Sequence, residues 1–310
     1  METPVLYFYS PPSDLVTIRV DDSKLRVTEA FPGPSGLGFD NGFGIQWRVR
    51  LHPPNHETRR FVPPVGERGA HYRHAREVPD AWIVEGLNDD LRTGVEKFIF
   101  YRGAGSQYLP GRIAAVADGR VKLDRGGLPA YLVEADGLAV KWRRIEGVAA
   151  GIKERGFETP YPSRDKQAQQ GAEGLAAALE GDLIDAGLTS AEARAMVTTW
   201  REAWMAEPGM RLLELLPRSY VDRVLPLEVK PQPAKSQRVF VARWEMIPEE
   251  LERRVIASAA DDQNQPEIPN SRFLPAIVER AAQVRDGEFR RDLAGLVSRL
   301  NQAANAGTKK

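Results

Sequence analysis

Residues 1–157 carry many short segments of strand character separated by turn residues, and this spacing limits the folds open to the chain. The segment 44–51 is the clearest, because apolar residues alternate with Gln46, Arg48 and Arg50. A sustained period of two is typical of a strand with one buried face. Other segments of this kind lie at residues 5–9, 15–20, 81–84, 97–101, 112–116, 120–123, 130–134 and 138–142. Strands this short and this closely spaced predict an antiparallel sandwich-like domain, not a parallel sheet with helical crossovers.

The apolar segment 97–101 runs into Arg102-Gly103-Ala104-Gly105, which raises the question whether these glycines hold a phosphate. A phosphate-binding glycine loop needs a helix that begins directly after it. Here Pro110-Gly111 follows instead, and both residue types break helices. We therefore interpret the two glycines as turn residues, and we expect no cofactor.

Beyond residue 157 the pattern changes to helical periodicity mixed with strands. Thr189-Ser190-Ala191-Glu192 fits a capping box, in which the first and last side chains satisfy backbone N–H groups at a helix start. An earlier helix is expected over residues 164–180, capped by Ser163. The sequence thus predicts an α+β fold. Its expected parts are a β-rich sandwich-like domain in residues 1–157, a helical and β segment packed on it in 158–247, a C-terminal helical region in 248–304 and a frayed tail in 305–310.

Composition excludes several classes of partner. The chain has 43 Lys and Arg against 43 Asp and Glu, so its net charge creates no long-range attraction to nucleic acid or to an anionic membrane. It contains no run of about 18 apolar residues. It also contains no cysteine, which excludes disulfides and cysteine nucleophiles. We expect a soluble chain with no nucleic-acid partner and no membrane span.

One stretch departs from this overall charge balance. Between Ile45 and Arg76 the chain has seven arginines but only two glutamates, Glu57 and Glu67. The simplest interpretation is that these arginines lie on polar loops and strand faces and meet acidic partners elsewhere in the fold.

The histidines and carboxylates near residue 70 are the remaining candidates for chemistry. His71, His74 and Glu77 have a spacing that would align three metal ligands on a helix, but the flanking glycines and Pro79 do not favour a helix there. We therefore predict no metal site, with these three residues as the weaker alternative. No spacing among the carboxylates of residues 67–90 singles out an acid/base pair, so no catalytic residue is predicted.

Aromatic residues gather around the glycine turn that follows residue 102. Trp82, Tyr101, Arg102 and Tyr108 flank this turn, and exposed aromatic and arginine side chains are typical of recognition surfaces. If these four side chains are exposed together, we expect them to form the binding surface.

The opening block Met-Glu-Thr-Pro-Val-Leu-Tyr-Phe-Tyr-Ser of residues 1–10 resembles that of an uncharacterised family of bacterial proteins. Further similar blocks are Glu96–Gly105, Glu192–Trp204, Leu212–Arg218 and Arg238–Glu245, and the resemblance extends to about residue 280. Members of this family usually carry an export signal ahead of the opening block, which implies an envelope or extracellular setting. The resemblance implies no activity, cofactor or site residue.

The expected location depends on the start of the chain. If an upstream export signal is missing, the resemblance implies a periplasmic or extracellular protein, whereas a true start at Met1 implies a cytoplasmic one. The leading functional hypothesis is a non-enzymatic binding or structural module of the bacterial envelope, whose partner is a glycan or another envelope protein. The alternative is a hydrolase that acts on a polysaccharide or peptide through residues 67–90.

Overall fold

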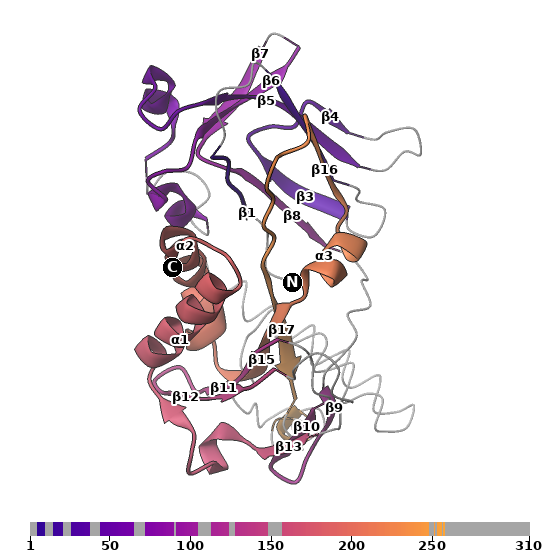
Figure 1. Cartoon of the computed structure of the whole chain (residues 1–310). Helices are drawn as coiled ribbons and strands as arrows, with labels where there is room; N and C mark the ends of the chain where they lie inside the picture. The colour runs from indigo at the N-terminus through magenta and orange to yellow at the C-terminus, as the bar shows by residue number, and fades with distance from the viewer. Residues whose placement is uncertain are drawn as a thin grey trace. The chain divides into compact units, whose positions relative to one another are not determined.

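The computed structural model describes most of the chain up to residue 257. The described residues are 5–9, 15–20, 26–37, 44–64, 72–89, 91–104, 113–123, 128–147, 157–247, 251, 253–255 and 257. Helices and antiparallel sheets both occur (Figure 1), which confirms the α+β class predicted from the sequence. No helix among these residues is long and apolar enough to cross a membrane.

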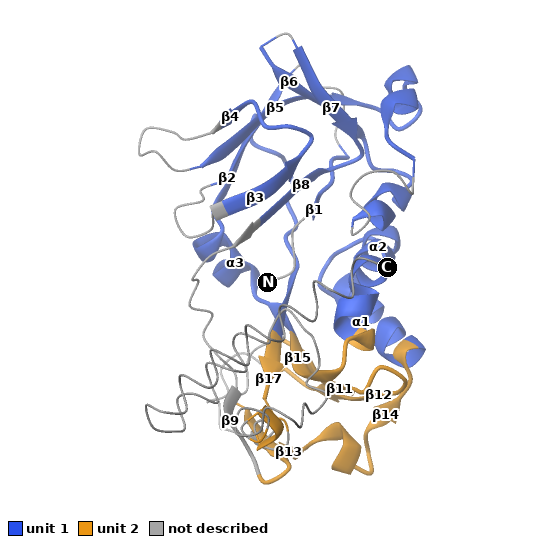
Figure 2. Ribbon diagram, turned by 180° about the vertical axis from the view of Figure 1, so that it is seen from behind, with its two compact units in different colours: residues 1–110, 173–204, 214–243 blue, residues 111–172, 205–213, 244–310 orange. Residues whose placement is uncertain are grey.

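The chain divides into two compact units, each built from separate stretches of sequence (Figure 2). Unit 1 comprises residues 1–110, 173–204 and 214–243, and unit 2 comprises residues 111–172, 205–213 and 244–310. The chain therefore returns to each unit, whereas the parts predicted from the sequence, 1–157, 158–247, 248–304 and 305–310, are consecutive.

The largest sheet of unit 1 has the strand order β16-β2-β5-β6-β7, with a short strand β4 that also pairs with β5. These strands are β16 (Leu227–Lys230), β2 (Val16–Val20), β5 (Ile45–His52), β6 (Ile83–Asn88), β7 (Leu91–Glu96) and β4 (Gly36–Leu37). Neighbours along this order are antiparallel. The predicted alternation of residues 44–51 is confirmed, since buried and less buried side chains alternate along β5.

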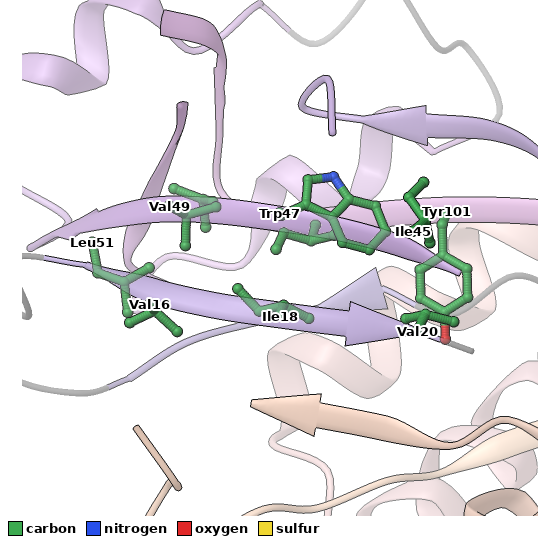
Figure 3. Close-up of a cluster of buried hydrophobic side chains, with 10 residues drawn as sticks. Val16, Ile18, Val20, Ile45, Trp47, Val49, Leu51 and Tyr101 are labelled. Carbon is green, nitrogen blue, oxygen red and sulfur yellow. The ribbon is translucent and has the colours of Figure 1, made fainter. Parts of the chain in front are cut away.

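One face of this sheet forms the core of unit 1. Val16, Ile18 and Val20 of β2 pack with the apolar residues of β5, and Figure 3 shows the two rows side by side. Trp47 lies in this cluster with no exposed surface, and its indole N–H donates to the Pro32 carbonyl over 2.9 Å. Because side chains alternate along a strand, the polar residues between these apolar ones belong to the opposite face of the sheet.

Smaller elements complete unit 1. A second sheet has the order β1-β8-β3, formed by β1 (Val5–Leu6), β8 (Ile99–Ala104) and β3 (Arg26–Phe31). Two 3₁₀ helices, η1 (Glu57–Phe61) and η2 (Arg73–Glu77), lie between β5 and β6 in the chain. Three α-helices follow later: α1 (Ala172–Asp185), α2 (Ser190–Arg201) and α3 (Arg218–Val224). The capping box at Thr189 and Glu192 is present as predicted and begins α2.

Unit 2 has its own core around two further groups of strands. One sheet has the order β13-β10-β9, from β13 (Phe157–Pro160), β10 (Arg120–Leu123) and β9 (Ile113–Ala117). The other has the order β14-β12-β11-β15-β17. Its strands are β14 (Gln169–Gln170), β12 (Val140–Ile145), β11 (Ala130–Ala135), β15 (Gly209–Leu216) and β17 (Phe240–Met246), the last two shared in sequence with unit 1. Val121, Leu132 and Leu212 are fully buried members of the core.

The first long helix begins later than the sequence predicts. A helix was expected over residues 164–180, but residues 162–164 form a 3₁₀ turn, η3, and residues 169–170 pair with β12. Gly171 then has a φ of 93°, a conformation that side chains disfavour, and α1 follows from Ala172. Most of the C-terminal helical region predicted for residues 248–304 lies outside the described residues.

Candidate functional site

The residues predicted to form a recognition surface do not lie on one exposed surface. Tyr101 has no exposed surface, and its ring centroid lies 5.9 Å from that of Trp47 in the core. Trp82 is half-buried against the same core, whereas Arg102 is exposed. Tyr108 lies outside the described residues. Tyr101 packs into this core together with Ile99, two residues earlier on β8, so it cannot contribute to a ligand surface here.

The weaker metal alternative has two of its three residues described. His74 and Glu77 lie on η2, and His74 Nδ1 is 3.1 Å from Glu77 Oε1. Arg73 Nε donates to His74 Nε2 over 3.2 Å, so a cation already occupies the second ring nitrogen. His71 lies outside the described residues. No group of three potential metal ligands occurs in the part of the chain that the structure describes.

A different constellation stands out on the outer face of the large sheet of unit 1, centred on Glu85. Its carboxylate accepts from Arg92 Nε over 2.6 Å and is 2.9 Å from His52 Nε2. Arg50, directly opposite on β5, places a guanidinium nitrogen 3.8 Å from it. The Glu85 side chain is only 8% exposed, whereas those of Arg50 and Arg92 are 50% and 43% exposed. One buried carboxylate thus positions two exposed arginines.

The sheet itself brings these residues together. Arg50 pairs with Glu85 across β5 and β6, and Leu87 pairs with Arg92 across β6 and β7. Residues directly opposite each other project from the same face of a sheet. Between these pairs, Gly86 faces Gly94, and a Cβ on Gly86 would come within 2.5 Å of Thr93 Oγ1. A glycine at this point therefore allows β7 to approach β6.

An exposed aromatic ring borders the Glu85 constellation. Phe61, at the end of η1, is 46% exposed. The guanidinium carbon of Arg92 lies 4.5 Å from its ring centroid, and that of Arg60 lies 4.8 Å from it. Arginine above an aromatic face is a favourable cation–π arrangement, and it holds both guanidinium groups beside an exposed apolar surface. We refer to Arg50, His52, Phe61, Glu85 and Arg92 together as the Glu85 cluster.

The start of η1 is fixed against the same cluster. His56 caps η1, and its Nδ1 accepts from the Thr58 backbone N–H over 3.2 Å. Its ring stacks on that of His52 with centroids 4.4 Å apart and an interplanar angle of 17°. Because His52 is also bonded to Glu85, the carboxylate, the two rings and η1 form a continuous set of contacts that positions Phe61.

The charge of Glu85 is maintained by its neighbours. Desolvation by burial raises the pKa of this carboxyl, but the hydrogen bonds from His52 and Arg92 outweigh it, and the pKa is lowered from its usual 4.5. Glu85 is therefore ionised at neutral pH. The cluster carries an excess of positive charge, because two arginines surround a single carboxylate.

Replacing Glu85 with glutamine is expected to lower the free energy of unfolding by about 2 kcal/mol at pH 7, since hydrogen bonds to a charged group are lost. The lowered folded-state pKa means that ionised Glu85 stabilises the protein above the unfolded pKa of 4.5, and that this contribution is lost as the pH falls through the folded-state value. Urea unfolding between neutral and acidic pH should therefore show the difference between wild type and Glu85→Gln shrinking on acidification. The control is Glu173→Gln, because Glu173 is 87% exposed. A difference that stays constant with pH would show that Glu85 contributes no charge-dependent stability.

One sequence signal bears on this site, the excess of arginines between Ile45 and Arg76, which includes Arg50 and Arg60. Glu85 and Arg92 could not be predicted as partners, because the pairing between them depends on the register of three strands. Phe61 could not be predicted either, since nothing in the sequence around this residue marks a ring that stays exposed. The simple interpretation of the arginines holds for Arg50, which meets an acidic partner in Glu85.

No family model, curated protein or solved structure matches the chain.

Proposed function

We propose that the protein is a non-enzymatic binding module of the bacterial envelope, and that the Glu85 cluster holds a glycan bearing carboxylate groups. The envelope setting is supported by the resemblance of residues 1–10 to exported bacterial proteins. The ligand class is supported by the chemistry of the cluster, in which exposed guanidinium groups can bind carboxylates in a bidentate manner.

The observation that carries this proposal is the position of Phe61. Its ring is 46% exposed and lies within 4.5 Å and 4.8 Å of two guanidinium carbons. An apolar surface beside fixed cations matches a charged sugar, which presents C–H groups and a carboxylate close together. The Glu85 carboxylate keeps Arg92 in place before the ligand arrives, and such pre-organisation lowers the entropic cost of binding.

The alternative function, a hydrolase that uses residues 67–90, finds less support at Glu85. A general acid needs a raised pKa, whereas the pKa of Glu85 is lowered by His52 and Arg92. Three cationic or hydrogen-bonding partners also make this carboxylate a poor base. Glu85 therefore fits the role of an anchor for arginines better than that of an acid/base residue.

Isothermal titration calorimetry with the full chain tests the proposal. We expect a β-1,4-linked mannuronate tetrasaccharide to bind and the neutral mannan tetrasaccharide of the same length to bind much more weakly. Arg92→Gln should weaken mannuronate binding about tenfold, because a charge-assisted hydrogen bond contributes about 1.5 to 3 kcal/mol. Phe61→Ala should weaken it several-fold through loss of the ring.

Matched controls come from exposed residues of unit 2. Leu138→Ala removes a fully exposed apolar side chain, and Arg120→Gln removes an arginine whose side chain is 51% exposed. Both controls should bind like the wild type. Absence of binding, or equal losses in the control variants, would refute the proposal, and shortening of the oligosaccharide during the titration would favour the hydrolase.

A further inference from the structure

Basic residues occupy alternate strands of one row across the large sheet of unit 1. Lys230 on β16 pairs with Thr17 on β2, and Thr17 pairs with Arg48 on β5. Arg48 in turn pairs with Leu87 on β6, which pairs with Arg92 on β7. The row therefore reads basic, neutral, basic, neutral, basic from one edge of the sheet to the other. We call Lys230, Arg48 and Arg92 the basic row.

The three basic residues project from the same face of the sheet as the Glu85 cluster. Directly paired residues share a face, and Arg92 belongs to both the row and the cluster. Adjacent strands lie about 4.8 Å apart, so basic residues on alternate strands are separated by about 10 Å along the row. The row runs across the strands, and its spacing is set by the backbone, not by flexible loops.

Arg48, in the middle of the row, is available to bind an anion. Arg92 and Lys230 each have a carboxylate partner, Glu85 and Glu228, and the Lys230 pair is exposed with a distance of 2.6 Å. Arg48 is half-buried, and no residue in the described part of the chain forms an ion pair with it. Its nearest paired neighbours are the uncharged Thr17 and Leu87. A partly desolvated guanidinium that no described carboxylate neutralises, two strands from the other cations of the row, attracts an anion from solution.

We infer that the basic row binds a linear acidic glycan that lies across the strands, with carboxylates of one chain at Lys230, Arg48 and Arg92. This inference rests on the proposed function and extends its site from the Glu85 cluster to the whole face of the sheet. In an extended uronate chain, successive carboxylates alternate between the two sides, so those on one side recur at every second sugar. Since one sugar unit is comparable in length to the strand spacing, about 4.8 Å, this repeat matches basic residues on every second strand.

The face favours a glycan over a single-stranded nucleic acid. Proteins that bind single strands place a series of aromatic rings along a basic groove, so that successive bases can stack. The residues between the cations here are Thr17 and Leu87, and the aromatic ring beside the row is Phe61 at its end. Among the described residues, this row therefore offers regularly spaced charge that is not interleaved with aromatic rings.

The inference predicts that affinity depends on the length of the glycan and on Arg48. By calorimetry with the full chain, a β-1,4-linked mannuronate octasaccharide should bind at least about tenfold more tightly than the disaccharide, because additional charge-assisted contacts add to the first. Arg48→Gln should lower octasaccharide affinity about tenfold and leave disaccharide affinity unchanged. Arg120→Gln, an exposed arginine of unit 2, serves as the matched control and should change neither.

The outcomes separate this inference from the proposed function. Two results would refute binding along the basic row but not binding at the Glu85 cluster. One is equal affinity for the disaccharide and the octasaccharide. The other is that Arg48→Gln has no effect while Phe61→Ala still weakens binding. Failure of every mannuronate to bind would overturn both. If a single-stranded oligonucleotide displaced the octasaccharide when present at a lower concentration than the octasaccharide, the assignment of a glycan ligand would be refuted. Loss of affinity with rising salt, steeper for the octasaccharide, is expected because more ion pairs form.

Discussion

Replacing Glu96 with glutamine is expected to lower the free energy of unfolding by about 3 to 5 kcal/mol, because it leaves a buried guanidinium without its counter-ion. Glu96 has no exposed side-chain surface, and that of Arg76 is 2% exposed. Arg76 Nη2 lies 2.6 Å from Glu96 Oε1, and Arg76 Nε donates to both carboxylate oxygens over 3.1 Å. Arg76 also donates to the Pro64 carbonyl, so it cannot turn toward solvent without losing several bonds at once.

Glu173→Gln is the matched control, since it makes the same substitution in another arginine–glutamate pair of unit 1. Glu173 is 87% exposed and its partner Arg201 is 38% exposed, so solvent screens the pair and the expected change is within about 1 kcal/mol. Urea unfolding at neutral pH, followed by far-UV circular dichroism, measures both variants. Similar decreases in the free energy of unfolding of the two variants would mean that the buried Arg76–Glu96 pair stabilises the protein no more than the exposed pair does.

Local patterns predicted much of the fold. The alternation in residues 44–51 predicted the central strand of the large sheet together with its buried face. Alternation of apolar and polar residues can be recognised within a single strand, without knowledge of its neighbours. The capping box at Thr189 and Glu192 was equally reliable, since both partners lie within one helical turn. These features depend on interactions between residues close in the chain.

Features that depend on distant residues were missed. Strand β7 escaped detection because Leu91–Glu96 contains a glycine and little apolar alternation, and it is held by pairing with β6. Tyr101 was predicted to lie on a binding surface because it precedes a glycine turn, whereas strand pairing places it in the core with Trp47. The basic row joins β16 to β7 through four pairings, so no inspection of neighbouring residues reveals it.

Replacing Trp47 with alanine is expected to lower the free energy of unfolding by about 3 to 5 kcal/mol through the cavity that it leaves. Trp47 is one of the largest fully buried side chains, and its neighbours on β2 and β5 are held by the sheet and cannot collapse into the space. The Pro32 carbonyl also loses its indole N–H donor. Urea unfolding followed by circular dichroism measures the change independently of tryptophan fluorescence. Trp82→Ala, at the half-buried margin of the same core, should cost less.

Comparison of Trp47→Ala with Arg48→Gln separates the two faces of the sheet, because adjacent residues of a strand project in opposite directions. Trp47→Ala should reduce stability and, at a temperature where the variant is folded, retain binding of the mannuronate octasaccharide. Arg48→Gln should change stability by less than about 0.5 kcal/mol, as expected for a surface substitution, and reduce binding. If Arg48→Gln instead destabilised the protein as strongly as Trp47→Ala, Arg48 would be part of the folded framework, and the basic row would lose its central ligand contact.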